Sequence, residues 1–99
     1  MIQYHFPLES NNHPFFEKQL SRIIPHRGGK GIFPENTLFA FDQSKKLGYN
    51  VLELDVRSTK DSVLVIFHDS TLIRMTGQTG KISQFNFDQM QKIEINSKN

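Results

Sequence analysis

Five stretches of the chain have a regular pattern of apolar and polar positions, and each predicts one element. Short apolar runs rich in β-branched and aromatic residues, bounded by Pro, Gly, Asp or Ser, predict strands. Longer stretches with apolar residues three or four positions apart, preceded by a capping residue, predict helices. The expected order is a strand over Arg22–His26, a helix over Thr37–Leu47, strands over Val51–Ser58 and Val63–His68, and a helix over Phe87–Ile93.

The first expected helix has signals at both ends. It opens with Pro34-Glu35-Asn36-Thr37, where Asn36 or Thr37 can cap the free amides and Glu35 is favourable near the positive end of the helix dipole. Gly48 is a natural C-terminal stop. The face predicted to be buried carries Leu38, Ala40, Phe41 and Leu47.

The two central strands are expected to form a hairpin. Only residues 59–62 separate them, which is too few for a parallel crossover. With the turn near Asp61, Asp55 lies near Ile66 or Phe67, and Glu53 lies opposite His68 or Asp69. His68 is therefore an expected neighbour of both carboxylates.

The C-terminal part is expected to contain a loop over Thr76–Lys81, which has two glycines, before the last helix. Asn86 should cap that helix with Gln89 three residues on. Phe85 and Met90 are placed to form a hydrophobic staple across its first turn.

The order of elements favours an α/β protein. Residues 1–20 have no clean period and are expected to be an irregular extension, with residues 21–99 as the folded domain. The 99 residues are 36% hydrophobic and 22% charged, with a net charge of +2, which is too small to indicate a nucleic-acid or membrane partner. No apolar stretch approaches the roughly 20 residues of a membrane span, and no signal-peptide pattern is visible, so a cytoplasmic location is expected. The absence of cysteine excludes disulfide and thiolate chemistry.

Two carboxylates need a chemical explanation. Glu53 and Asp55 are two positions apart in an apolar strand, so their side chains leave the same face. A single carboxylate there usually faces solvent or pairs with Lys or Arg, but two on one face repel each other unless a cation or proton lies between them. Oxygen ligands favour a hard cation, Mg²⁺ or Ca²⁺. The pair supplies at most four oxygens, fewer than the roughly six to eight that Ca²⁺ takes, so water, substrate or other residues must add ligands.

Two histidines and an arginine extend this constellation. A lone histidine at the end of an apolar run is more often a satisfied core residue, but His26 and His68 each have a charged neighbour and lie near the carboxylate pair. Two histidines can serve as general acid and general base near neutral pH. The planar fork of Arg27 suits a phosphate. A metal, a phosphate clamp and two proton-transfer groups together describe phosphodiester cleavage.

The motifs His26-Arg27-Gly28, 34–37, 53–56, Thr59-Lys60-Asp61 and Phe67-His68-Asp69, in this order and spacing, resemble the N-terminal signature of the glycerophosphodiester phosphodiesterase family. The resemblance covers residues 24–93 and includes the trailing Leu72, Arg74, Thr76 and Gly80. It implies a (β/α)₈ barrel with its site at the C-terminal ends of the strands. It also implies divalent-cation-dependent hydrolysis of small-molecule glycerophosphodiesters to glycerol 3-phosphate and an alcohol. The implied roles are acid and base for His26 and His68, metal ligands for Glu53 and Asp55, a phosphate contact for Arg27 and a supporting role for Glu35.

Two departures from the family pattern stand out. Ser62 occupies a turn position where the family usually has glycine, which loses the residue that adopts a positive φ most easily. Such a barrel needs about 250 residues, so residues 21–99 are expected to correspond to its N-terminal third. The family's third acidic metal ligand has no equivalent here, and little activity is expected from the chain alone. Two alternatives remain open: an inactive remnant or binding fragment, and a phosphoinositide phospholipase-type relative. The sequence does not determine the oligomeric state.

Overall fold

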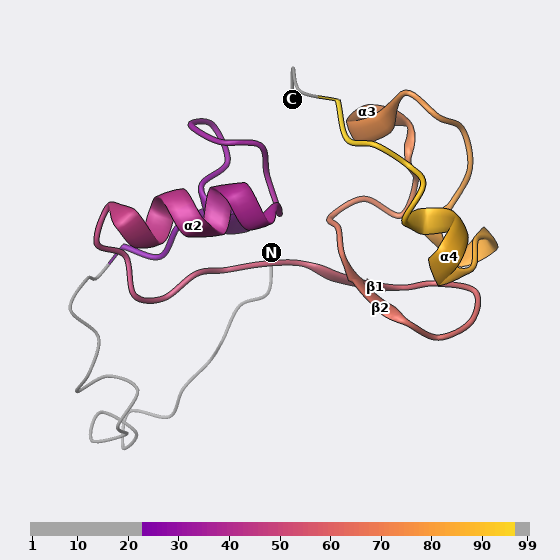
Figure 1. Cartoon of the computed structure of the whole chain (residues 1–99), viewed down its shortest axis with the longest axis horizontal. Helices are drawn as coiled ribbons and strands as arrows, with labels where there is room; N and C mark the ends of the chain where they lie inside the picture. The colour runs from indigo at the N-terminus through magenta and orange to yellow at the C-terminus, as the bar shows by residue number, and fades with distance from the viewer. Residues whose placement is uncertain (1–22, 97–99) are drawn as a thin grey trace.

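The computed structural model describes residues 23–96, which form two groups of elements joined by the extended segment 49–55 (Figure 1). One group contains a 3₁₀ turn and the longest helix; the other contains a β-hairpin and three short helical segments. The elements are η2 (His26–Gly28), α2 (Leu38–Lys46), β1 (Val56–Ser58), β2 (Leu64–Ile66), α3 (Ile73–Thr76), η3 (Ile82–Gln84) and α4 (Phe87–Met90). The expected irregular extension over residues 1–20 lies outside the described residues.

The prediction of a strand over Arg22–His26 is wrong for its described part. Residues 23–25 form no strand, and η2 begins at His26. Pro25 has no N–H to donate to a ladder, and its carbonyl accepts from the amides of Glu53 and Gly28, each at 3.2 Å. Positive φ angles at Arg27, Gly28 and Gly29 then turn the chain back. Instead of pairing as a strand, residues 25–28 therefore form backbone hydrogen bonds with Glu53 alone in segment 49–55.

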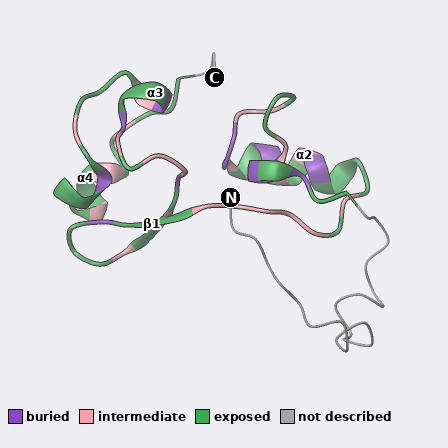
Figure 2. Cartoon of the chain, turned by 180° about the vertical axis from the view of Figure 1, so that it is seen from behind, coloured by how far each residue is buried: buried purple, intermediate pink, exposed green. Residues whose placement is uncertain are grey.

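Helix α2 confirms the predicted capping and part of the predicted buried face, since Ala40 is buried and Phe41 is partly buried. The Thr37 hydroxyl accepts from the Ala40 amide at 3.0 Å, and Gly48 has a φ of 98° just beyond the end. Leu38 and Leu47 are exposed, whereas the buried residues of the helix are Ala40 and Ser44 (Figure 2). The Ser44 hydroxyl donates to the Gly28 carbonyl at 2.7 Å. The helix therefore packs closely against the glycine turn, where the Ser44 hydroxyl and the Phe41 ring meet Gly28.

The hairpin has the predicted register. Strands β1 and β2 are antiparallel, with Val56 opposite Ile66, and the Phe67 amide donates to the Asp55 carbonyl at 3.0 Å. Both strands are shorter than expected. Residues 51–54 leave the ladder because the backbone of Glu53 bonds instead to the η2 region, donating to Pro25 and accepting from Gly28. Glu53 is therefore not paired in a ladder with His68 or Asp69.

The hydrophobic core lies within the hairpin group. It contains Phe67, Leu72, Met75 and Ile82, with Val65, Phe85, Met90 and Ile93 packed against it. The loop predicted over Thr76–Lys81 begins at residue 77, one residue later than predicted, because Thr76 is the last residue of α3. The predicted capping box is present, since the Gln89 side chain accepts from the Asn86 amide at 2.8 Å. Helix α4 ends at Met90 and not at Ile93. Beyond Met90 the backbone hydrogen bonds join residues three apart, such as that from the Ile93 amide to the Met90 carbonyl. None of the helices within residues 23–96 is long and apolar enough to cross a membrane.

Candidate functional site

The η2 turn fixes Arg27 in a rarely used backbone conformation. Its φ is 50° and its ψ is 37°, in the left-handed region that non-glycine residues seldom adopt. In this conformation the Arg27 amide donates to Glu53 Oε2 at 2.7 Å. The next residue must be glycine, because a Cβ atom at Gly28 would lie 2.3 Å from the Phe41 ring. A strained turn held by its surroundings is typical of functional sites.

Arg27 is also the cation beside the two carboxylates that the sequence places together. Its amide binds Glu53, and its Nε atom lies 3.8 Å from Asp55 Oδ2. Asp55 Oδ2 accepts a hydrogen bond from Asn36 Nδ2 at 3.0 Å. The Nε2 atom of His26 lies 3.9 Å from Glu53 Oε2, and its ring is half exposed. The predicted residues of the η2 region and segment 49–55 therefore meet at Arg27.

Glu35 lies behind Arg27 and is almost fully buried, at 5% exposure. Its two oxygens lie 3.3 and 3.1 Å from Arg27 Nη1, and Arg74 Nη2 donates to Oε1 at 2.5 Å. Burial alone would raise the pKa of Glu35, but the hydrogen bonds from Arg74 and Arg27 lower it overall. The site is thus held together by a buried, ionised carboxylate between two arginines.

His68 occupies the other end of the site. Its Nδ1 atom lies 2.8 Å from Asp69 Oδ1. Arg74 donates to both oxygens of Asp69, from Nε at 2.7 Å and from Nη2 at 3.0 Å. These bonds from Arg74 hold the pKa of Asp69 well below its usual range, and the two carboxylates raise the pKa of Arg74. His68 therefore lies beside a carboxylate that stays ionised.

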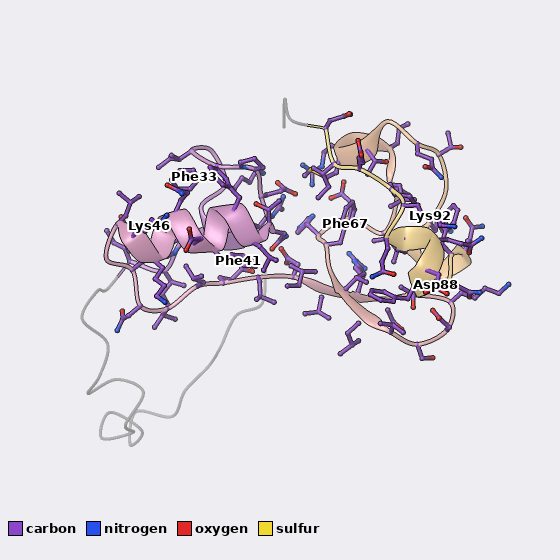
Figure 3. All side chains as sticks on the ribbon, viewed as in Figure 1. Phe33, Phe41, Lys46, Phe67, Asp88 and Lys92 are labelled. Carbon is purple, nitrogen blue, oxygen red and sulfur yellow. The ribbon has the colours of Figure 1, made fainter. Side chains whose placement is uncertain are left out.

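All six residues predicted for the site belong to one chain of polar contacts. It runs from His26 through Glu53, Arg27, Glu35, Arg74 and Asp69 to His68, with Asp55 and Asn36 beside Arg27. Within residues 23–96 no hydrogen bond or ion pair joins His68 directly to Glu53 or Asp55, so their proximity stays a prediction. The side chains of the two element groups face each other in Figure 3, with Phe67 on the side of the hairpin group that is turned toward α2.

Three residues of this network had no predicted role in the site. The sequence indicates Asn36 as a possible helix cap and as part of the 34–37 motif, whereas its side-chain amide donates to Asp55. Asp69 was noted as a neighbour of His68, and Arg74 as part of a motif. Arg74 lies five residues after Asp69, in the short helix α3, and from there its side chain reaches back to the Asp69 carboxylate. The link to Glu35 joins residues 39 apart, which no local pattern indicates.

Among the described residues, two buried polar side-chain atoms have no hydrogen-bond partner, Glu53 Oε1 and Arg27 Nε, although Nε also lies in the ion pair with Asp55. Buried polar atoms without hydrogen bonds are costly, so ligands at such points are favoured. The carboxylate oxygen fits a cation, and the guanidinium N–H fits an anionic oxygen. The network also holds two arginines against four carboxylates, an excess of two negative charges. Within residues 23–96 no cluster of three or more His, Asp or Glu side chains is placed to hold a metal ion.

Comparison with known proteins gives consistent results. The profile of the glycerophosphoryl diester phosphodiesterase family matches residues 26–99. The chain is 40% identical over 76 residues to a glycerophosphodiester phosphodiesterase of Caldanaerobacter subterraneus, covering 77% of this chain and 31% of that protein. The structure of a glycerophosphodiester phosphodiesterase from Agrobacterium tumefaciens matches with a TM-score of 0.71 and 36% identity, over 77% of this chain and 33% of that one.

A second solved structure is informative about ligands. The Oleispira antarctica phosphodiesterase, solved with the product sn-glycerol-3-phosphate, matches with a TM-score of 0.72 and 33% identity, over 76% of this chain and 30% of that one. The chain thus spans about a third of the length of these relatives. Because the matched structures are (β/α)₈ barrels, the predicted fold class, the N-terminal part of such a barrel, is confirmed.

Proposed function

The chain belongs to the glycerophosphoryl diester phosphodiesterase family, and on this premise we propose that it supplies part of a site for metal-dependent hydrolysis of glycerophosphodiesters. The products would be glycerol 3-phosphate and an alcohol. The observation that carries the proposal is the continuous polar network from His26 to His68, because it contains two histidines, a phosphate-type arginine and a carboxylate pair.

The two histidines would move the protons. Hydrolysis forms a bond from an oxygen nucleophile to phosphorus and breaks the bond to the leaving oxygen. One histidine takes the proton of the nucleophile, and the other gives a proton to the leaving alcohol. The His26 side chain is half exposed and that of His68 is about a third exposed, so both rings can be reached by a substrate.

Arg27 and the carboxylate pair would bind the charged parts of the substrate complex. The Nε atom of Arg27, which has no hydrogen bond within the described residues, is suited to a phosphate oxygen. The unpartnered Oε1 of Glu53 and the excess negative charge fit a divalent cation, which Glu53 and Asp55 would help to hold. When bound, such an ion neutralises negative charge on the phosphate. The donor set suits Mg²⁺ and Ca²⁺ alike, and water or other residues would complete the shell.

A domain-replacement experiment tests these roles in a complete barrel. Residues 26–96 of this chain replace the matching segment of the Oleispira antarctica phosphodiesterase, and release of glycerol 3-phosphate from glycerophosphocholine is measured with Mg²⁺ or Ca²⁺. We expect activity, with losses of roughly 10²-fold or more in kcat for His26→Ala and for His68→Ala. The matched control is Asp42→Asn, because Asp42 forms an exposed ion pair with Lys46 on the surface of α2, away from the site network.

Two results would contradict the proposal. The first is a folded chimera without activity beside an active parent enzyme. The second is a chimera whose activity is unaffected by loss of either histidine. A phosphoinositide offered in the same assay tests the phospholipase-type alternative, which predicts that this substrate is preferred. The 99-residue chain alone is expected to turn over slowly or not at all, since a misplacement of about 1 Å in a site costs on the order of 10²-fold in rate.

A further inference from the structure

Arg74 is the residue through which the two ends of the site are connected. It lies in α3, in the hairpin group, whereas Glu35 precedes α2 in the other group. Its guanidinium donates to Glu35 from Nη2 and to both oxygens of Asp69. A planar fork of donors can serve two carboxylates at once, which a lysine ammonium cannot do with the same geometry.

The contact between Asp69 and His68 determines how the imidazole is held. An ionised carboxylate only accepts hydrogen bonds, so an Asp69 oxygen 2.8 Å from Nδ1 requires a proton on Nδ1. In the neutral ring the other nitrogen, Nε2, then carries the lone pair. Without such a partner a neutral histidine in water favours the opposite tautomer, with its proton on Nε2. Asp69 therefore determines which nitrogen of His68 is available to exchange a proton with a substrate.

We propose that Asp69 and Arg74 are positioning residues: Asp69 fixes His68 in the tautomer with a free Nε2, and Arg74 fixes Asp69 relative to Glu35. This inference rests on the proposed function for its catalytic meaning, since it assigns Nε2 of His68 as the reactive nitrogen. The contacts that carry it are independent of that function.

The remaining charged group at His68 acts differently. Arg57 donates from Nε at 2.9 Å and from Nη2 at 2.6 Å, but to the backbone carbonyl of His68 and not to the ring. Arg57 and Arg74 are thus two arginines with strong hydrogen bonds around the same residue, and only Arg74 acts on the ring through Asp69. This makes Arg57 a matched control for charge and for local stability.

The test is the tautomer of His68 in the full chain, measured by long-range ¹H–¹⁵N NMR of the imidazole above the pH at which the ring becomes neutral. Four histidines are present, and the His68 signals are identified by their loss in His68→Gln. We expect the Nδ1–H form to predominate in the wild-type chain and the Nε2–H form in Asp69→Ala. Arg74→Gln should lower the Nδ1–H population, Arg74→Lys should lower it less, and Arg57→Gln should leave it unchanged.

Several outcomes would overturn the proposal. One is a wild-type His68 in the Nε2–H form, and another is a folded Arg74→Gln chain with the wild-type population. If Arg74→Gln does not fold, Arg74→Lys decides, because its single ammonium cannot hold both Asp69 oxygens and Glu35; a population equal to wild type would then count against the proposal. An equal change in Arg57→Gln would assign the effect to general loss of stability.

Activity of the chimera separates this inference from the proposed function. If both hold, Arg74→Lys lowers kcat more than it changes KM. A tautomer that responds as expected in an inactive chimera would support the positioning role and contradict the function. An active chimera whose tautomer does not respond would support the function and overturn the positioning role.

Discussion

Arg27 combines a strained backbone with three carboxylate partners. Its left-handed conformation directs the amide to Glu53, while its side chain lies between Glu35 and Asp55. Local strain of this kind costs of order 1–3 kcal/mol and persists only where the surroundings determine the conformation. Here the surroundings are the close packing of Gly28 on α2 and the hydrogen bond from Ser44. The geometry of the site therefore depends on a residue without a side chain.

We predict that Gly28→Ala is more destabilising than Gly31→Ala. Both glycines have positive φ, 72° and 100°, but an added Cβ would collide with the Phe41 ring at position 28 and meet nothing within 4 Å at position 31. The collision should cost about 1–3 kcal/mol beyond the backbone strain that both variants share. Urea unfolding followed by circular dichroism measures the difference. Equal losses of unfolding free energy in the two variants would show that the contact of Gly28 with Phe41 does not restrict the side chain at position 28.

A second prediction at the residue scale concerns the stability of the fold at low pH. Hydrogen bonds from Arg74 lower the pKa of Asp69, and hydrogen bonds from the two arginines outweigh burial to lower that of Glu35. A carboxyl whose folded pKa is lowered stabilises the fold fully above its unfolded pKa, near 4, and this stabilisation is lost as pH falls through the folded pKa. We expect the free energy of unfolding to fall below about pH 4.

Urea unfolding at a series of pH values checks this expectation. Asp69→Asn should be less stable at neutral pH and should lose less stability on acidification, because one of the two groups responsible is absent. Asp42→Asn is the control, since its ion pair with Lys46 is exposed at the surface. A pH dependence in Asp69→Asn identical to that of the wild type would refute the assignment.

Among the elements, the hairpin shows how a turn sets the register of a strand pair. The turn lies between Thr59 and Val63, which are joined by two hydrogen bonds: the Thr59 amide donates to the Val63 carbonyl, and the Val63 amide donates to the Thr59 hydroxyl. It positions Val56 opposite Ile66 and brings the Asp55 carbonyl to the Phe67 amide. Because the register places Asp55 and His68 on the two arms of one hairpin, the turn contributes to the site from a distance. The turn also contains Ser62, with a φ of 65°.

We predict that Ser62→Gly stabilises the chain by roughly 1 kcal/mol. The positive φ observed at this position confirms the turn conformation expected from the sequence, and serine pays a steric cost there that glycine does not. Ser62→Ala is the matched control, because it removes the hydroxyl and keeps the strain, so it should bring no gain. Thermal unfolding of the three chains measures the effect. A gain in both variants would assign it to the hydroxyl and not to the backbone.

At the scale of the whole molecule, the core and the site lie in different places. Large apolar side chains pack in the hairpin group, while the site network joins that group to the α2 group through polar contacts. Several apolar residues remain exposed, among them Leu38 at 82%, Ile32 at 77% and Leu64 at 71%. Each group of elements thus keeps large apolar side chains that the described residues do not cover.

We predict weak binding of divalent ions by this chain. Glu53 and Asp55 offer at most four oxygens, and within the described part of the chain no third acidic or histidine side chain joins them as a metal cluster. Dissociation constants for Mg²⁺ and Ca²⁺ should be on the order of 10⁻⁴ M or weaker. Calorimetric titration measures them, with Glu53→Gln as the variant that should lose binding and Asp88→Asn as the control. A submicromolar constant insensitive to Glu53 would contradict the proposed ligand set.

Features of the fold and site that depend on residues close in the sequence could be predicted, whereas those that depend on distant residues could not. The Thr37 cap, the capping box at Asn86 and the hairpin register are set by neighbours within a few residues, and all were predicted. The burial of Ser44 and the exposure of Leu38 and Leu47 on α2 were not, since they depend on where the Gly28 turn packs. The role of Arg74 was also missed, because its partner Glu35 lies 39 positions away. The predicted site residues share one network, but their chemical roles remain proposals.

The contact between Glu35 and Arg74 also has a consequence for the order in which parts of the molecule fold. Contacts between residues close in sequence form first, and those that close long loops form later. The hairpin pairs residues six to ten positions apart, whereas this ion pair joins residues 39 apart. The site should therefore assemble after the hairpin and open before it. Native-state hydrogen exchange can detect this: the buried amides of Asn36 and Thr59 both have 2.9 Å hydrogen bonds, yet that of Asn36 should exchange sooner.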